Sequence, residues 1–258
     1  MTSVTTAQMA IYSAMLMPAL YLIFKHGKPG LLGWFYFNAF CLLRILGGAL
    51  ALSGNSAANI IASVGLSPLL LAAAGILHES NKLRLSGDPK VSWSLTLSYH
   101  LLITGATAIL AIGAASLQGS NPHSSDLTKV KIGIAIVAVA WVVLLSWSVF
   151  VWFQHGNTPN QHAARAGRQL NIAIFSAMPF IGIRVLYSLV AFVSQTPSLN
   201  PATGSVGVHV GLILVPELIA TMILLVFGWR TRNGRSLEKD SENGNAIRLN
   251  DDASRTAC

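Results

Sequence analysis

Long apolar stretches alternate with short polar ones along the first 229 residues of the chain, and polar residues predominate after them. A helix that crosses the hydrocarbon layer of a membrane needs about 20 mainly apolar residues. The apolar runs are continuous and do not alternate at every second residue, which is typical of helices and not of barrel strands. The pattern therefore predicts an all-α bundle of seven transmembrane helices. The predicted spans are residues 7–25, 30–52, 57–78, 92–117, 132–153, 170–193 and 206–228.

Composition supports a membrane protein and excludes other classes. Hydrophobic residues make up 53% of the chain and charged residues 10%, whereas about a quarter of a soluble domain is charged. Intrinsic disorder of the whole chain requires low hydrophobicity, and the two cysteines cannot staple a secreted scaffold. We expect a seven-helix domain over residues 1–229 that contacts the lipid bilayer, followed by a disordered polar tail over residues 230–258.

Basic residues flank the predicted spans unequally. Thirteen Lys and Arg residues fall on one side of the membrane, and only Lys129 and Lys131 fall on the other. Because basic loops stay on the cytosolic side, we expect the N-terminus to be outside or lumenal and the C-terminus to be cytosolic. The net charge of +8 follows from the same asymmetry, so it predicts no nucleic-acid partner.

Three charged side chains fall well inside predicted spans, namely Arg44, Arg184 and Glu217. An isolated charge at the bilayer centre costs at least about 2.5 kcal/mol, so such residues face the bundle interior and find partners. A rise of about 1.5 Å per residue places all three within roughly 5 Å of one plane. We therefore predict that they meet. Pro216 should kink the helix next to Glu217, which is the one acidic residue well inside a span.

Two interpretations of this charged cluster stay open at this point. In the first, a structural ion pair fixes one packing of the bundle. In the second, Glu217 moves a proton, Tyr187 relays it from the helix face of Arg184, and the guanidiniums stabilise developing negative charge. Asn38 on the inner half of its span and His209 near the outer end of its span also carry polar groups. The candidate substrate-binding residues are Arg44, Arg184, Asn38 and His209.

The histidines in predicted loops do not indicate a metal site. His26, His123, His155 and His162 fall in predicted loops, without a paired acid or the cysteine spacing of a metal centre. We expect neither a metal nor a cofactor.

Four segments carry a resemblance to known proteins: Arg44-Ile-Leu-Gly-Gly48, Gly65-Leu-Ser-Pro-Leu-Leu-Leu71, Pro179-Phe-Ile-Gly-Ile-Arg-Val-Leu-Tyr-Ser188 and Val215-Pro-Glu217. Through them, residues 7–228 resemble a family of small fungal seven-helix membrane proteins, some of which are associated with secondary-metabolite gene clusters. In size and topology the chain is also similar to fungal membrane-bound terpene cyclases and related epoxide-opening enzymes. The resemblance implies a protein of the endoplasmic reticulum or another endomembrane, rather than of the plasma membrane.

These observations predict an integral membrane enzyme of fungal secondary-metabolite biosynthesis. It would catalyse cofactor-free acid–base isomerisation, epoxide opening or cyclisation of a hydrophobic small-molecule substrate, with Glu217 and Tyr187 as catalytic residues. The alternative is a non-enzymatic transporter or sensor in which an intramembrane Arg–Glu pair switches between helix packings. An exchange of the charges at Arg184 and Glu217 should preserve the second function and abolish the first.

Overall fold

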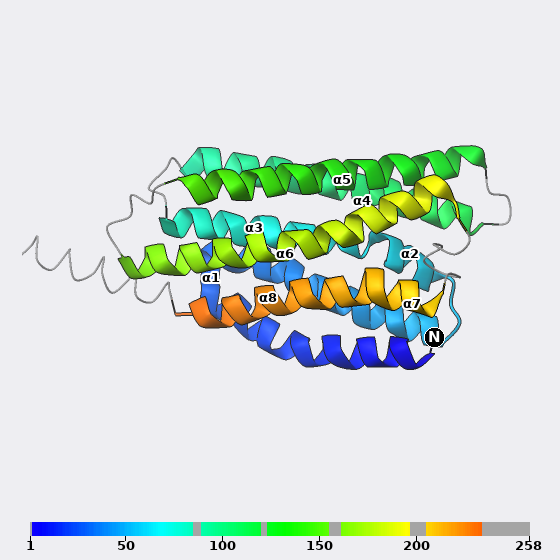
Figure 1. Ribbon diagram of the computed structural model, residues 1–258, viewed down its shortest axis with the longest axis horizontal. Helices are drawn as coiled ribbons and strands as arrows, with labels where there is room; N and C mark the ends of the chain where they lie inside the picture. Colours follow the sequence, from blue (N-terminus) through cyan, green and yellow to red (C-terminus); the bar gives the residue numbers. More distant parts are fainter. Residues whose placement is uncertain (1, 85–88, 120–122, 155–160, 197–204, 234–258) are drawn as a thin grey trace, which may run out of the picture.

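The computed structural model describes residues 2–84, 89–119, 123–154, 161–196 and 205–233 of the 258-residue chain. Every element in these ranges is a helix (Figure 1), and six helical stretches are long and apolar enough to cross a membrane. Large apolar side chains point away from the bundle, and the most exposed include Phe24, Phe153 and Met17 at 82%, 75% and 73%. Because such a surface is unfavourable in water, the protein is an integral multi-pass membrane protein whose outer face contacts lipid.

The first helix, α1 (Thr2–Leu52), reverses direction at Gly27. Gly27 has φ 59° and ψ −153°, a combination that glycine adopts far more readily than other residues. The ring centroids of Tyr12 and Phe40 are 5.5 Å apart, although a straight helix would separate these residues by about 40 Å. The two halves of α1 therefore lie side by side, and they contain the first two predicted spans.

Three further helices each contain one predicted span, namely α4 (Pro89–Leu117), α5 (Ser124–Phe153) and α6 (Gln161–Ser194), and α5 and α6 begin eight and nine residues before their spans. The predicted span 57–78 is divided into two helices, α2 (Ala57–Val64) and α3 (Leu66–Arg84). Helix α3 also continues six residues beyond the predicted end of this span. The last stretch consists of α7 (Val206–His209), the π-helix η2 (Val210–Leu214) and α8 (Val215–Thr231). Most of the predicted disordered tail, residues 234–258, lies outside the described residues.

Helix α3 occupies the centre of the bundle. Of its 19 residues, 17 are buried, and it packs against α1, α4 and α6. The backbones of α1 and α3 touch at Gly33 and Gly75, because a Cβ on Gly33 would lie only 2.7 Å from the backbone nitrogen of Ile76. Small residues at such positions let membrane helices approach closely.

The bundle has two ends (Figure 1). One end, called here the N-terminal end, carries the N-terminus, the connection from α1 to α2 and the start of α7. The opposite end, called here the Gly27 end, carries the reversal of α1 and the last turn of α8. Each end lies near one group of buried polar side chains, and both groups are described below.

Candidate functional site

Arg44, Arg184 and Glu217 meet inside the bundle, which confirms the contact predicted from the sequence. Glu217 Oε1 accepts a hydrogen bond from Arg44 Nη2 and a second one, of 2.9 Å, from Arg184 Nε. The three side chains come from the second half of α1, from α6 and from α8, and all three are buried. They are called here the ion triad.

The two guanidiniums have further partners that fix their orientation. Arg184 also donates to the hydroxyl of Ser188 and, over 3.5 Å, to the carbonyl oxygen of Ala62 in α2. Arg44 lies 5.2 Å from the ring centroid of Phe40, and its Nε has no hydrogen-bond partner among the described residues. With all three members ionised, the ion triad carries a formal charge of +1, so it has a surplus positive charge to offer a ligand.

The irregular start of the last span positions Glu217. The π-helix η2 ends with a bond from the Val215 N–H to the carbonyl of Val210, and Pro216, in the first turn of α8, contributes no N–H. Glu217 follows at once and is held by α8, where Thr221 Oγ1 donates to its carbonyl oxygen over 2.8 Å. Single π-helical turns are frequent at functional sites, and here one immediately precedes the buried carboxylate.

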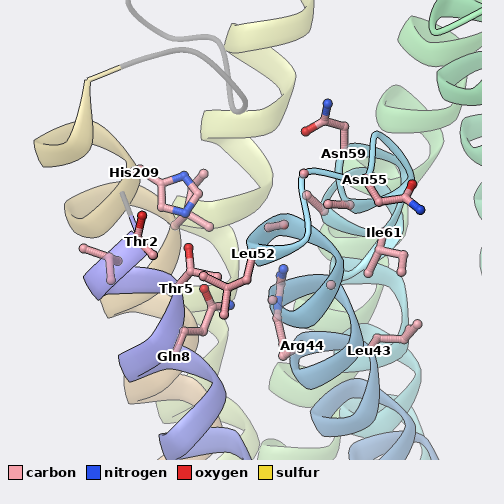
Figure 2. A pocket seen from close by; sticks show the side chains of 18 of the residues that line it. Thr2, Thr5, Gln8, Leu43, Arg44, Leu52, Asn55, Asn59, Ile61 and His209 are labelled. Atoms are coloured by element: carbon pink, nitrogen blue, oxygen red, sulfur yellow. The ribbon is translucent and has the colours of Figure 1, made fainter.

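A cavity of about 560 Å³ lies beside the ion triad at the N-terminal end. Arg44 and Arg184 both line it, whereas Glu217 does not. Figure 2 shows Arg44 between the first turns of α1, which carry Thr5 and Gln8, and the side formed by Leu43 and Ile61. The cavity therefore combines a cationic group with polar and apolar walls. Other polar residues in its lining are Thr2, Asn55, Ser56, Asn59 and His209.

The other residues selected from the sequence separate into two groups. The ring of Tyr187 lies 5.8 Å from the guanidinium carbon of Arg184, and His209 lines the cavity, so both lie at the site. Asn38 does not join them, because its amide donates over 2.8 Å to the carbonyl oxygen of Trp34 in its own helix and the side chain is absent from the cavity lining. Asn38 therefore lies away from the cavity, and its buried Oδ1 has no hydrogen-bond partner among the described residues.

Tyr12 belongs to the site but was not selected from the sequence. It is fully buried in the first half of α1, in the neighbourhood of Glu217 and Arg44. The second carboxylate oxygen of Glu217, Oε2, is also buried and has no hydrogen-bond partner among the described residues. The only sequence signal for Tyr12 is a polar hydroxyl within an apolar run, which is common near membrane surfaces.

A second buried cluster lies at the Gly27 end and corrects two expectations from the sequence. His26 Nδ1 lies 2.5 Å from Glu79 Oε1, so His26 does have a paired acid and Glu217 is not the only acid inside the bundle. His26 Nε2 lies 3.0 Å from the carbonyl oxygen of Gly228, and Trp34 Nε1 donates to Glu79 Oε2 over 3.2 Å. Glu79 follows directly after the predicted end of its span at residue 78, which is why the sequence pattern placed it outside the membrane.

Neither cluster has the composition of a metal centre. Within the described ranges, no group of three or more His, Cys, Asp or Glu side chains could hold a metal ion. The chemistry available at the ion triad is recognition of an oxygen-bearing group by guanidiniums and proton transfer through Glu217 and the neighbouring tyrosines.

The fold and these clusters define a helical multi-pass membrane protein with a charged interior that is accessible from a cavity. The chain belongs to the family of a domain of unknown function, DUF7702, whose family model matches residues 1–234. The match includes every residue of the ion triad, of the cavity lining and of the His26–Glu79 cluster. No curated protein and no solved structure matches the chain.

Proposed function

We propose that the protein is a membrane transporter or sensor that binds an amphiphilic small molecule in the cavity at the N-terminal end. The anionic or carbonyl oxygen of this ligand contacts Arg44 and Arg184, and its apolar part lies against the walls of the cavity. One observation carries the proposal, namely that both guanidiniums line the cavity while their counter-ion, Glu217, does not.

The charge of the site supports an anionic ligand. A ligand carboxylate would compensate the formal charge of +1 that Arg44, Arg184 and Glu217 leave together. Guanidinium–carboxylate contacts in a partly dry site are about twice as strong as neutral hydrogen bonds. The ligand would compete with Glu217 for the same donors, and each outcome of that competition favours a different packing of α1, α6 and α8.

The size and lining of the cavity support an amphiphile. Its volume of about 560 Å³ lies within the range of about 300–1,000 Å³ that is usual for small-molecule sites. Leu43, Leu52, Ile61 and Ile213 supply apolar contact area, and Gln8 supplies an amide that can orient a polar group. These features suit a fatty or terpenoid acid better than a simple inorganic anion.

We also propose seven membrane crossings, with the N-terminal end outside or lumenal, in an endomembrane. The reversal of α1 at Gly27 supports two crossings by α1. The distribution of basic residues supports the orientation, because Lys25, Lys28, Lys82 and Arg84 belong to the Gly27 end. Under this arrangement the ligand enters from the outer or lumenal side.

Binding of octanoate tests the proposed site. Octanoate should bind the purified protein in detergent micelles, as measured by calorimetry after subtraction of the heat from empty micelles. Octanol, which lacks the charge, and butyrate, which lacks the tail, should bind much more weakly. Arg44→Gln and Arg184→Gln should each weaken octanoate binding by about 10- to 100-fold, because each removes a charge-assisted hydrogen bond worth about 1.5–3 kcal/mol.

Arg84→Gln is the matched control for these variants. Arg84 is also buried, but it donates to the carbonyl oxygens of Val151 and Gln154 near the end of α5 and lies at the Gly27 end. Its loss should reduce stability and leave octanoate binding unchanged. Equal binding of octanol and octanoate, or unchanged binding by Arg184→Gln, would refute the proposed role of the guanidiniums.

An enzyme of fungal secondary metabolism is the second candidate function, and the unpaired Glu217 Oε2 favours it. That oxygen could carry a proton to an epoxide or alkene, with the Tyr187 or Tyr12 hydroxyl as a relay. Cells with Glu217→Asp, which keeps the charge but moves the carboxylate, should then accumulate an unconverted precursor in lipid extracts analysed by mass spectrometry. A transporter or sensor with the same variant would leave the chemical structures of the extracted compounds unchanged.

A further inference from the structure

The His26–Glu79 pair at the Gly27 end holds a proton between two helices that are distant in sequence. Backbone carbonyl oxygens only accept hydrogen bonds, so the bond of 3.0 Å to Gly228 requires a hydrogen on His26 Nε2. His26 Nδ1 then faces Glu79 Oε1 across 2.5 Å. Without a proton, this contact would place a nitrogen lone pair against a carboxylate, which is repulsive. The pair therefore binds one shared proton, as imidazolium with carboxylate or as imidazole with carboxylic acid.

The same contacts close the Gly27 end of the bundle. His26 comes from the first half of α1 and Trp34 from the second half, Glu79 from α3 and Gly228 from α8. The packing is tight, because a Cβ on Gly30 would lie 2.6 Å from Glu79 Oε2, and one on Gly228 would overlap the Trp34 ring. The shared proton thus joins four helical segments at the end opposite the cavity.

We propose that His26 and Glu79 form a proton-binding site that keeps the Gly27 end closed while the proton is bound and allows it to open when the proton leaves. Removal of the proton converts an attraction between α1 and α3 into a repulsion, and water that enters on opening solvates the carboxylate. In a transporter, this site would couple ligand movement to a proton. The proposal does not depend on the identity of the ligand or on the role of Arg44 and Arg184.

The charged residues around the site are mostly basic. The pair is neutral with its proton and negative without it, so neighbouring cations stabilise the deprotonated form. Among the described residues, Glu79 is the only acid at this end, because Asp126 and Glu217 have partners elsewhere in the bundle. His78 faces Ser92 and Thr96 of α4. The basic residues on the segments that form the site are Lys25, Lys28, Lys82, Arg84, Arg230 and Arg232. Helix α6, which packs against α3 and α8, adds His162, Arg165 and Arg168 in its first turns.

Four of these basic residues have partners away from the pair, and one of them is Arg230, which lies over the ring of Phe227. Lys25 lies over the ring of Tyr21, Arg84 binds the end of α5, and Arg232 lies over the ring of Trp229. They therefore act on the site through long-range electrostatic interactions and not as direct partners of Glu79. A proton leaving the site would move into a region of positive potential at the membrane surface, from which water carries it away.

Accessibility of a cysteine deeper in the bundle tests the proposal. Ala19 is fully buried and precedes His26 by seven residues, about two helical turns, so it lies on the same face of α1. Ala19→Cys in a protein with Cys41→Ser and Cys258→Ser can be treated with a membrane-impermeant maleimide in nanodiscs between about pH 5 and pH 8. Gln8→Cys in the cavity lining is the positive control and should react throughout.

Glu79→Gln provides the reference for each pH value. A glutamine amide donates to His26 Nδ1 without a proton that can be lost, so the Gly27 end should stay closed. The labelling rate of Ala19→Cys in the protein that keeps Glu79 is divided by its rate in the Glu79→Gln variant, and this ratio cancels the pH dependence of the thiol itself. We expect the ratio to rise with pH, by up to about tenfold per pH unit for a single proton while the open form is rare.

A control substitution at another buried histidine, His78, tests whether the effect is specific to the His26–Glu79 pair. His78→Gln changes a buried histidine on the same helix as Glu79 that hydrogen-bonds to the hydroxyls of Ser92 and Thr96, and it should leave the rise in the ratio unchanged. A ratio that stays flat with pH would overturn the proposal, as would an equal effect of His78→Gln. If Glu79→Gln does not fold, the double variant His26→Gln/Glu79→Gln serves as the reference, because its two amides can hydrogen-bond to each other and neither of them titrates.

Discussion

The charge balance of the ion triad predicts that replacing its acidic residue by a neutral one costs more stability than replacing one of its basic residues. With all three ionised, Arg44→Gln leaves one guanidinium on one carboxylate, which is a neutral pair. Glu217→Gln instead leaves two buried guanidiniums side by side, with no other carboxylate of the described residues among their partners. Loss of the acid should therefore destabilise the protein more than loss of either base.

The structure gives a magnitude for this difference. Removal of one partner from a buried ion pair typically costs about 3–5 kcal/mol, and Glu217→Gln should reach about 4 kcal/mol because the guanidiniums of Arg44 and Arg184 are only 6% and 3% exposed. Arg44→Gln loses one charge-assisted hydrogen bond, worth about 1.5–3 kcal/mol, and also removes the surplus charge. We expect it to cost about 2 kcal/mol.

Equilibrium unfolding in mixed micelles with increasing dodecyl sulfate measures these free energies. The double variant Arg44→Gln/Glu217→Gln should be more stable than Glu217→Gln alone, because only one guanidinium remains. A cost of Arg44→Gln equal to or larger than that of Glu217→Gln would refute the assignment of a net positive charge to the triad. A double variant less stable than both single variants would refute it as well.

Further predictions concern glycines and follow from their surroundings. Gly27→Ala should lower the free energy of unfolding by about 1–3 kcal/mol, since an alanine at φ 59° and ψ −153° is strained, and dodecyl sulfate unfolding measures this change. Gly228→Ala should be more damaging, by about 3 kcal/mol, because the added methyl group overlaps the Trp34 ring. Gly105→Ala in α4, where nothing lies within 4 Å of an added Cβ, should be neutral or stabilising. Comparable losses for all three variants would contradict the packing described at Gly27 and Gly228.

The sequence predicted the ion triad because each of its members interrupts a long apolar run. Residue spacing along a helix gives depth in the membrane, and equal depth made a contact between Arg44, Arg184 and Glu217 the expected arrangement. Spacing does not give rotation about the helix axis. Asn38 has a suitable residue type and lies in the same span as Arg44, yet it bonds to its own helix.

The His26–Glu79 cluster was missed because both residues lie where apolar runs end. His26 stands between Lys25 and Gly27, and Glu79 precedes a polar segment that includes Lys82 and Arg84. Polarity at such positions is normal for a membrane surface, so a residue that turns inward there looks the same as one that faces water. Only the reversal of α1 and the extension of α3 to Arg84 bring the two side chains together.

The contact between Gly33 and Gly75 has a mechanical consequence for the whole interior. With no side chain between the two backbones, the second half of α1 and α3 can tilt about this point but cannot approach further. Glu79 lies four residues from the contact along α3, whereas Arg44 lies eleven residues from it along α1. A tilt that separates the helices by about 1 Å beside Glu79 thus shifts them by about 3 Å, in the opposite sense, at the depth of Arg44. A small event near one membrane surface is in this way enlarged at the depth of the ion triad.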